Sequence, residues 1–315
     1  MQEADAEAKI QCLIREAYKK LKEANPEDAL AALNGALRVN YECEEALYTL
    51  KCLNWWLEKI KNLDAAGDSY SKGAFIISQW KSYLLFLNRL GIGFDTSRYA
   101  VRHFVYGLAL GFYKEVLEDG SDRFDPSLFF QIGRCYKGVG DYVSASEYLG
   151  KVVHFKKEDA LALSELADVK AMLGETREAK VLFREAFFID PQGVDIDSLE
   201  SALIRSLIDN VASRGYSGGE LLERLPVYAA LMGLFSVKRE IKLAELGRLK
   251  QAIFSLENEV RNNHEDKNVL IPNLINKYLW LMDYYESVHE NPSAIEEIKL
   301  KIKIIEPDIY DRFFA

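Results

Sequence analysis

The chain has 315 residues, of which 49% are hydrophobic and only 7 are proline, so its composition favours a folded core over disorder. Its 49 acidic side chains outnumber 40 Lys and Arg and give a net charge of −9, which argues against binding to a nucleic acid backbone. No apolar run reaches the roughly 18 residues that span a bilayer, so no direct membrane insertion is expected.

Residues 10–43 form the first predicted helix hairpin. Ala17 and Ala29 are small residues at positions where two antiparallel helices approach closely, and a larger side chain there would hold the backbones apart. Asn25 and Pro26 indicate the turn between the two helices. The rest of residues 1–125 is predicted to be helical, without a repeat register.

Residues 81–114 are basic within this acidic chain. They carry five basic residues, Lys81, Arg89, Arg98, Arg102 and Lys114, against Asp95 alone, and eight aromatic residues are interleaved with them. Two interpretations remain open. The aromatic residues form a helical core with the basic residues at its solvated edge, or the segment binds an acidic partner. Within it, residues 104–113 are uncharged and are predicted to form a buried helix.

Residues 126–193 contain two consecutive 34-residue units in the same register. The second unit places characteristic residues at offsets 4, 7, 8, 11, 15, 20, 24, 27 and 32: Leu163, Leu166, Ala167, Lys170, Gly174, Ala179, Phe183, Ala186 and Pro191. The first unit has Phe129, Ile132, Gly133, Tyr136, Gly140, Ala145, Leu149, Val152 and Lys157 at the same offsets. Small residues at offsets 8 and 20 permit close helix packing, and the glycines at offset 15 end the first helix of each unit.

This pattern resembles the tetratricopeptide repeat (TPR) family, whose period is 34 residues and whose hairpin ends near a proline. The resemblance implies an all-α fold, a right-handed α-solenoid of TPR-like helix hairpins with irregular helical segments. In TPR geometry the first helix of each hairpin lines the concave groove. The residues expected to bind a partner there are Phe130, Arg134, Lys137, Ser164 and Asp168. Phe130 beside Arg134 suits a partner peptide or helix that buries an apolar anchor. Alternatively, Arg134 and Asp168 simply pair across the groove.

Residues 194–315 are predicted to form a C-terminal helical region in which the register fails as far as residue 274. Over residues 242–261 an apolar stripe with 3,4 spacing is expected to pack on the solenoid, with self-association or partner docking as the alternative. Its members are Leu246, Leu249, Ile253, Leu256 and Val260. A degenerate TPR-like unit is predicted at residues 275–308, with Asn291 and Pro292 in its turn.

No pattern of catalytic or metal-binding residues is found. The four cysteines contain no C-x-x-C pair, and the four histidines are scattered without an i, i+4 partner. Gly91 and Gly93 form a G-x-G without a preceding strand pattern or a third glycine, which is not a phosphate-binding loop. We therefore expect no enzyme activity, no cofactor and no metal.

The leading functional hypothesis is a non-catalytic scaffold or adaptor that binds a partner peptide or helix in the groove. The alternative is a structural subunit of a larger assembly that uses the repeats for oligomerisation. A small-molecule carrier using the aromatic segment Tyr70 to Tyr113 is a third, and it requires an enclosed apolar pocket. The N-terminus shows no signal peptide, which indicates the cytoplasm, or the periplasm or secretion if a leader has been removed.

Overall fold

The computed structural model describes residues 2–91, 93–119, 124–235, 241–262, 266–288 and 292–314. Every regular element in these ranges is a helix, which confirms the prediction of an all-α fold. The chain divides into two compact units, residues 1–152 and 153–315, each with a hydrophobic core. The predicted boundaries at residues 125 and 193 are not tested by this division and stay predictions.

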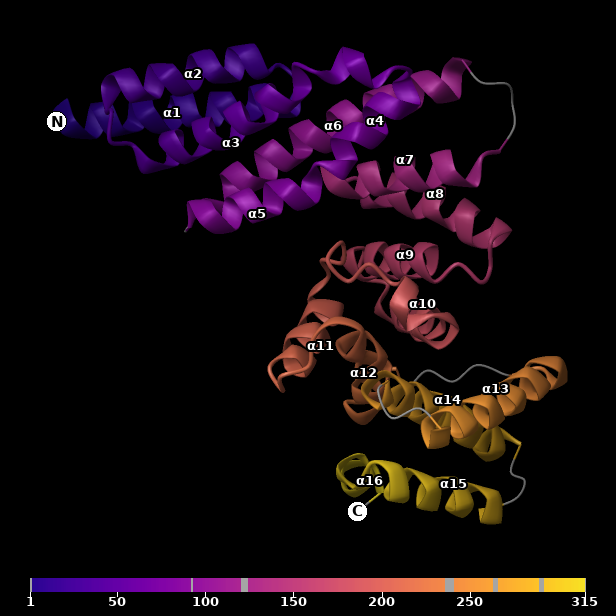
Figure 1. Cartoon of the computed structure of the whole chain (residues 1–315). Helices are drawn as coiled ribbons and strands as arrows, with labels where there is room; N and C mark the ends of the chain where they lie inside the picture. The colour runs from indigo at the N-terminus through magenta and orange to yellow at the C-terminus, as the bar shows by residue number, and fades with distance from the viewer. Residues whose placement is uncertain are drawn as a thin grey trace. The chain divides into compact units, whose positions relative to one another are not determined.

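Nine helical elements belong to the N-terminal unit in the part of the chain that the structure describes. They are α1 (Gln2–Lys22), α2 (Pro26–Val39), α3 (Glu44–Ile60), η1 (Leu63–Ala66), α4 (Ser69–Ser78), α5 (Trp80–Leu90), α6 (Asp95–Asp119), α7 (Pro126–Val139) and α8 (Tyr142–Phe155), which ends just past the boundary of the unit. The antiparallel pair α1 and α2 packs together, and α6 packs against α1, α3, α4 and α7 (Figure 1). The long helix α6 is therefore the centre of this unit.

Aromatic rings fill the core of the N-terminal unit. The ring of Trp56 is fully buried, with its centroid 5.2 Å from that of Tyr83 and 6.1 Å from that of Trp80. Residues 104–113 lie within α6, and both Phe104 and Tyr113 are buried, as predicted. The interpretation that the aromatic residues of residues 81–114 form a helical core is thus confirmed for those that are buried. The basic side chains Lys81, Arg89 and Lys114 are exposed.

Three hairpin turns close in the same way, at offset 15 of the repeat. Ala24, Gly140 and Gly174 all have positive φ, at 57°, 84° and 81°. Each donates its N–H at 3.1 Å to the carbonyl three residues earlier, and the next residue donates at 2.9 Å to the carbonyl five residues earlier. This is the Schellman arrangement, which satisfies carbonyl groups left free at a helix end. The same arrangement closes the helix before Gly233, outside the 34-residue spacing.

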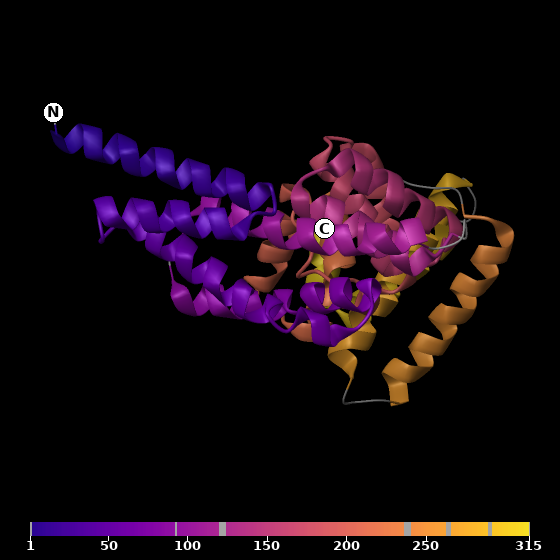
Figure 2. The same ribbon diagram turned by 90° about the horizontal axis from the view of Figure 1, so that it is seen from above.

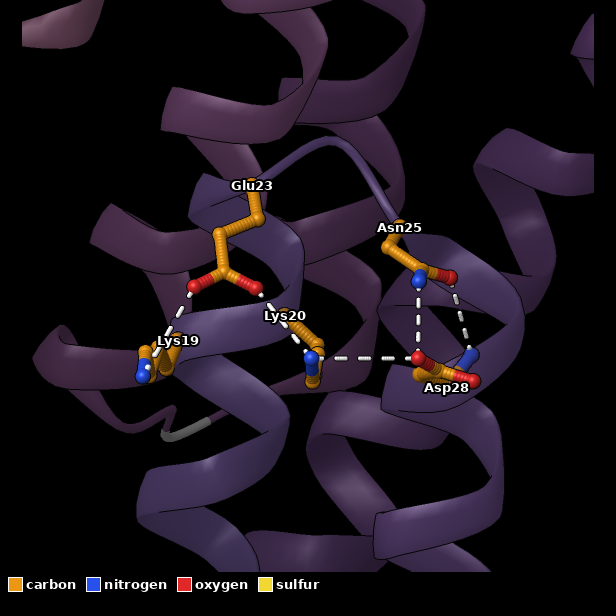
Figure 3. A network of polar contacts seen from close by, with 5 residues as sticks. All are labelled: Lys19, Lys20, Glu23, Asn25 and Asp28. Carbon is orange, nitrogen blue, oxygen red and sulfur yellow. Dashed lines mark hydrogen bonds and ion pairs between the residues drawn. The ribbon is translucent and has the colours of Figure 1, made fainter.

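The turn between α1 and α2 carries a network of polar contacts in addition (Figure 3). The side chain of Asn25 accepts a hydrogen bond from the backbone N–H of Asp28 at 3.2 Å and thereby caps α2, which begins at Pro26, the second residue of the predicted turn. Lys20 lies between two carboxylates, 3.2 Å from Glu23 and 3.8 Å from Asp28. Because these carboxylates are exposed, the ion pairs add little stability, and the backbone cap is the stronger contribution.

In the three hairpins that the structure describes fully, the residues predicted to allow close helix approach are all buried. They are Ala17, Ala29, Gly133, Ala145, Ala167 and Ala179. In the predicted unit at residues 275–308, Ala294 at the equivalent offset 20 is only partly buried. A Cβ atom added to Gly133 would meet the side chain of Leu149 at 2.7 Å, which is too close without a shift. Small residues recur at these offsets because the paired helices pack closely there.

In the C-terminal unit, too, every regular element of the described residues is a helix. The elements are α9 (Ala160–Met172), α10 (Thr176–Ile189), η2 (Pro191–Gly193), α11 (Ala202–Ala212), α12 (Gly218–Leu231), α13 (Leu243–Asn262), α14 (Lys267–Ser287), α15 (Pro292–Ile305) and α16 (Pro307–Phe314). α9 pairs with α10, and α14 packs against α12, α13 and α15. α15 begins at Pro292, while Asn291 of the predicted turn lies outside the described residues.

The apolar stripe of residues 242–261 faces the core. Leu249 and Ile253 are buried in it, and the other three members pack against it as α13 runs beside α14 (Figure 2). This confirms the prediction that the stripe packs on its own chain. On the outer side of α13, Phe254 is exposed. α14 begins at Lys267, eight residues before the predicted repeat unit, so this hairpin has a longer first helix than the resemblance implied.

Candidate functional site

Phe130 and Arg134 form a contact pair on α7. They lie one helical turn apart, so both side chains project from the same face. The guanidinium carbon of Arg134 is 5.7 Å from the centre of the Phe130 ring, which is within range of a cation–π interaction. Both side chains are partly exposed, whereas Lys137, the next predicted member on this helix, is only 3% exposed. Of the three predicted α7 residues, two thus offer surface to a partner.

Ser164 and Asp168 on α9 are fully buried. The Ser164 hydroxyl donates to the Leu161 carbonyl of its own helix at 2.9 Å. The Asp168 carboxylate accepts hydrogen bonds from the backbone N–H groups of Glu200 and Ser201, both at 2.8 Å, just before α11 begins. Asp168 of α9 therefore fixes the start of α11, a role that its sequence spacing did not indicate.

No partner molecule tests the assignment of the five predicted residues, so it stays a prediction. Burial nevertheless separates them. Phe130 and Arg134 are accessible, whereas Lys137, Ser164 and Asp168 have almost no exposed surface with which to contact a partner. Side chains that bind partners contribute most when they stand at a surface and are desolvated on binding. We therefore keep the Phe130–Arg134 pair as the part of the predicted site that a partner can reach.

A cleft in the C-terminal unit lies between α10, α13 and α14. Its volume is about 250 Å³. Apolar side chains from the three helices form its walls, among them Phe188 of α10, Leu249 of α13 and Trp280 of α14. Charged side chains also line it: Glu158, Glu185, Glu245, Arg248 and Lys277. The cleft thus combines apolar walls with charged groups, and with five charged residues among its eleven lining residues it is more polar than a typical small-molecule site.

Two of the walls belong to a stack in which two aromatic rings lie between two cations. The guanidinium carbon of Arg184 is 4.4 Å from the Trp280 ring, whose centroid is 4.0 Å from that of Phe188. The ammonium of Lys277 lies 4.0 Å from the Phe188 ring. Arg184 also forms an ion pair with Asp283. Because each ring is held on one side by another ring and on the other by a cation, the aromatic walls of the cleft are fixed in position.

The same region of α14 completes the C-terminal end of α10. The last carbonyl groups of a helix have no partner within it. Here the side-chain amide of Asn276 donates to the Phe187 carbonyl at 3.1 Å, and Lys277 donates to the Phe188 carbonyl. A cation at a helix C-terminus is also favoured by the helix dipole. α14 therefore supplies donors to carbonyl groups at the end of α10 in addition to the Asp190 backbone N–H, which binds the Ala186 carbonyl.

Burial perturbs the ionisation of Lys277, which lines the cleft, and of Glu223 on α12. It lowers the pKa of Lys277 to about 8, although the negative charges of Glu223, Asp190 and Glu185 oppose this shift. Burial likewise raises the pKa of Glu223, and a hydrogen bond from Gln192 at 2.9 Å counteracts it. Gln192 donates in addition to the Gly219 carbonyl at 3.0 Å, which ties η2 to α12. These groups hold the irregular part of the unit together.

Sequence reasoning missed the cleft because its walls are distant in the chain. Phe188 and Trp280 occupy unremarkable positions in their own segments, and only the fold brings them together across 92 residues. The aromatic character of each was visible, but no local spacing linked the two. The 242–261 stripe was the one available signal, because Leu249 forms a wall of the cleft from α13.

Comparison with known proteins does not place the chain in a family. No protein-family model matches its sequence, and no curated protein does. The structure itself adds two findings for the residues that it describes. None of the helices there is both long and apolar enough to cross a bilayer. No group of three or more His, Cys, Asp or Glu side chains there is arranged to hold a metal ion.

Proposed function

We propose that this protein is a non-catalytic scaffold of the TPR type, in which helix hairpins stack as a right-handed solenoid and bind a partner peptide or helix. The observation that supports this most is the identical closure of three hairpins at Ala24, Gly140 and Gly174, with buried small residues where the paired helices meet. Units that repeat in this way bury their apolar faces on neighbouring units and leave one helix face for ligands.

The partner surface of this proposal is centred on Phe130 and Arg134. An aromatic ring with a guanidinium over it is characteristic of energetically important contacts, because both residue types are enriched among binding hot spots. The partner contributes an apolar side chain against Phe130 and an acceptor, such as a carboxylate or a carbonyl, to Arg134.

Capture of partners from a lysate of the native organism tests the proposal. The parent chain is compared with a Phe130→Ala, Arg134→Glu double variant, and captured proteins are identified by mass spectrometry. A matched control, Tyr41→Ala with Arg38→Glu, makes the same kinds of change at exposed residues of and beside α2. We expect one protein to be captured by the parent and by the control but lost from the α7 variant.

A Leu85→Ala, Arg89→Glu variant adds an arm to this experiment. Both residues are exposed on α5, one turn apart, within the basic segment. Loss of the partner from this variant alone moves the contact to that segment and contradicts the α7 surface. If the parent captures no protein at all, the scaffold function itself is contradicted.

A structural subunit that uses its repeats for oligomerisation is the second candidate. The observation in its favour is on α15, where Leu300 and Ile304 are 57% and 72% exposed one turn apart. Exposed apolar side chains of this kind are suited to an interface between copies or subunits. Light scattering on the purified chain tests it. A dimer that dissociates on Leu300→Lys with Ile304→Lys supports this candidate, and a monomer at all concentrations contradicts self-assembly.

A further inference from the structure

We propose that the cleft between α10, α13 and α14 binds an apolar side chain that a basic segment of a partner protein carries. The proposal rests on the scaffold function above, and it names a second site and the chemistry of what fits there. Three properties of the cleft support it: its size, the rigidity of its walls and the charge of its rim.

The volume of the cleft suits one large side chain. At about 250 Å³ it lies below the roughly 300–1,000 Å³ of sites that enclose a drug-sized ligand. Interfaces between proteins use smaller pockets, each filled by a single aromatic or aliphatic anchor. Phe188, Ile189 and Ile241 of the lining are partly exposed and provide the apolar contact for such an anchor, whereas Leu249 and Trp280 are only 3% and 4% exposed. The size therefore favours a side chain of a protein over a free small molecule.

The walls are already in place before binding. Trp280 is buried between Phe188 and Arg184, and Leu249 belongs to the core of the unit. Lys277 holds the end of α10 through the Phe188 carbonyl, so the backbone beside the cleft is fixed as well. A pocket that needs no rearrangement spares the ordering cost that would otherwise reduce affinity.

The charge around the cleft selects a basic partner. The carboxylates of Glu158, Glu185 and Glu245 and the cations of Arg248 and Lys277 line it, so the lining carries one net negative charge. Glu158 forms an ion pair with Arg248 at 3.6 Å, and Glu245 accepts a hydrogen bond from the backbone N–H of Lys242 at 3.0 Å. The surrounding residues 153–315 contain 28 Asp and Glu against 21 Lys and Arg, so the C-terminal unit carries most of the negative charge of the chain. Such a field attracts Lys and Arg beside the anchor and repels acidic segments.

Synthetic peptides and the purified full chain test this inference. The basic probe has three lysines, a phenylalanine, a leucine and three lysines. The acidic probe replaces all lysines by glutamates, and the probe without an anchor replaces the phenylalanine and leucine by alanines. Binding is measured by fluorescence anisotropy of labelled peptides at low and at physiological salt. We expect the basic probe to bind at least about tenfold more tightly than either other probe, because it alone supplies both anchor and charge.

Two variants test whether the basic probe binds in the cleft. Ala252→Phe fills it from α13, and Glu185→Lys with Glu245→Lys reverses the charge of its lining. We expect the first to weaken the basic probe about tenfold or more, and the second to do the same while strengthening the acidic probe. The control Glu259→Lys with Asp311→Lys makes an equal change of net charge at exposed residues outside the cleft and leaves binding nearly unchanged. Thermal melting confirms that each variant is folded.

Tryptophan labelled with fluorine gives an independent reading. The chain has 4 tryptophans, and Trp280→Phe assigns the signal of the one that lines the cleft. The basic probe is expected to shift that signal and to leave those of Trp55, Trp56 and Trp80 in place. Equal affinity for the basic probe and for the probe without an anchor overturns the inference. It is also overturned if Glu259→Lys with Asp311→Lys weakens binding of the basic probe as much as Glu185→Lys with Glu245→Lys does. If a partner is captured through α7 but no probe enters the cleft, the inference fails and the scaffold function stands.

Discussion

The core of the N-terminal unit is built around aromatic rings, with Trp56 and Tyr83 at its centre. Lys137 is its one buried charged side chain among the described residues, whereas the C-terminal unit buries several, such as Asp168, Arg184 and Glu223. The difference follows from the connections between helices. In the C-terminal unit the chain leaves the hairpin pattern after α10, and the irregular segments expose backbone groups that no helix satisfies. Buried backbone groups must find partners, so polar side chains are drawn inside to supply them.

Three polar contacts in the C-terminal unit meet such a need. Asp168 holds the N–H groups at the start of α11, Asn276 binds a free carbonyl of α10, and Gln192 ties η2 to α12. Hydrophobic burial is non-directional and tolerates small shifts, while these hydrogen bonds require defined geometry. The comparison therefore predicts that the N-terminal unit responds mainly to changes of volume, and the C-terminal unit to changes of polarity and pH.

The largest effect is expected from Trp56→Ala in the N-terminal unit. Trp56 is fully buried against Trp80 and Tyr83, so its removal leaves a cavity and costs about 3–5 kcal/mol of the free energy of unfolding. Trp56→Phe keeps an aromatic ring in place. It also removes no hydrogen bond, because the indole N–H of Trp56 has no partner. The loss in the free energy of unfolding is therefore smaller than for Trp56→Ala. Denaturant unfolding and hydrogen exchange of peptide fragments measure both. Equal losses for the two variants would contradict the importance of ring packing.

In the C-terminal unit the largest effect is expected from Asp168→Ala. The substitution leaves the N–H groups of Glu200 and Ser201 buried without their carboxylate, at a cost of about 3–4 kcal/mol. Asp159→Ala is the matched control, because Asp159 caps α9 through one N–H group at its surface and its loss costs about 1 kcal/mol. Hydrogen exchange of the segment before α11 should accelerate only for the first. Similar losses for both aspartates would show that the burial of Asp168 is unimportant.

Lys277→Met tests the dependence on pH. The pKa of Lys277 is about 8 in the folded chain, below its ordinary value of 10.5, because the amine is buried. The unfolded chain therefore binds more protons between these pH values, and the free energy of unfolding of the parent rises from pH 8 to 10.5 by at most about 3 kcal/mol on account of this group. This contribution of Lys277 to the free energy of unfolding is lost as the pH falls from 10.5 through 8.

The methionine variant has no such group, so the difference between parent and variant isolates Lys277 from other titrations. We expect parallel denaturant unfolding at pH 7.5 and 10.5 to show a larger gain for the parent. Lys250→Met, at an exposed position of α13, serves as the control and should keep the gain. An equal gain in the parent and in Lys277→Met would show that this amine is not responsible.

The sequence predicted the features that local spacing determines. Gly140 and Gly174 end helices because a residue in the left-handed region is needed there, and the alanines at the helix contacts are small because the backbones approach closely. The stripe of α13 also packs inward as its periodicity indicated. These are short-range patterns, in which a residue type is dictated by its immediate conformation or by a neighbouring helix.

The candidate sites were predicted less well, because they depend on residues far apart in the chain. Asp168 has the offset of a groove residue, yet its carboxylate binds backbone 32 residues later. The cleft depends on Phe188 and Trp280, which only the fold brings together. The repeat register could not supply these contacts, since it specifies which face of a helix is apolar and not what an irregular connection places against it.

The smallest expected effect concerns a place where the first hairpin departs from the others. Ala24 adopts φ of 57°, whereas the equivalent Gly140 and Gly174 carry no Cβ atom to oppose that conformation. Ala24→Gly should therefore stabilise the chain by about 0.5–1 kcal/mol, the relief of strain exceeding the added freedom of the unfolded state. Ala31→Gly makes the same change in the middle of α2 at an exposed position and should destabilise by about 1 kcal/mol. Opposite shifts of the unfolding midpoint are the expected result. A destabilising Ala24→Gly would mean that this turn is not closed as the other two are.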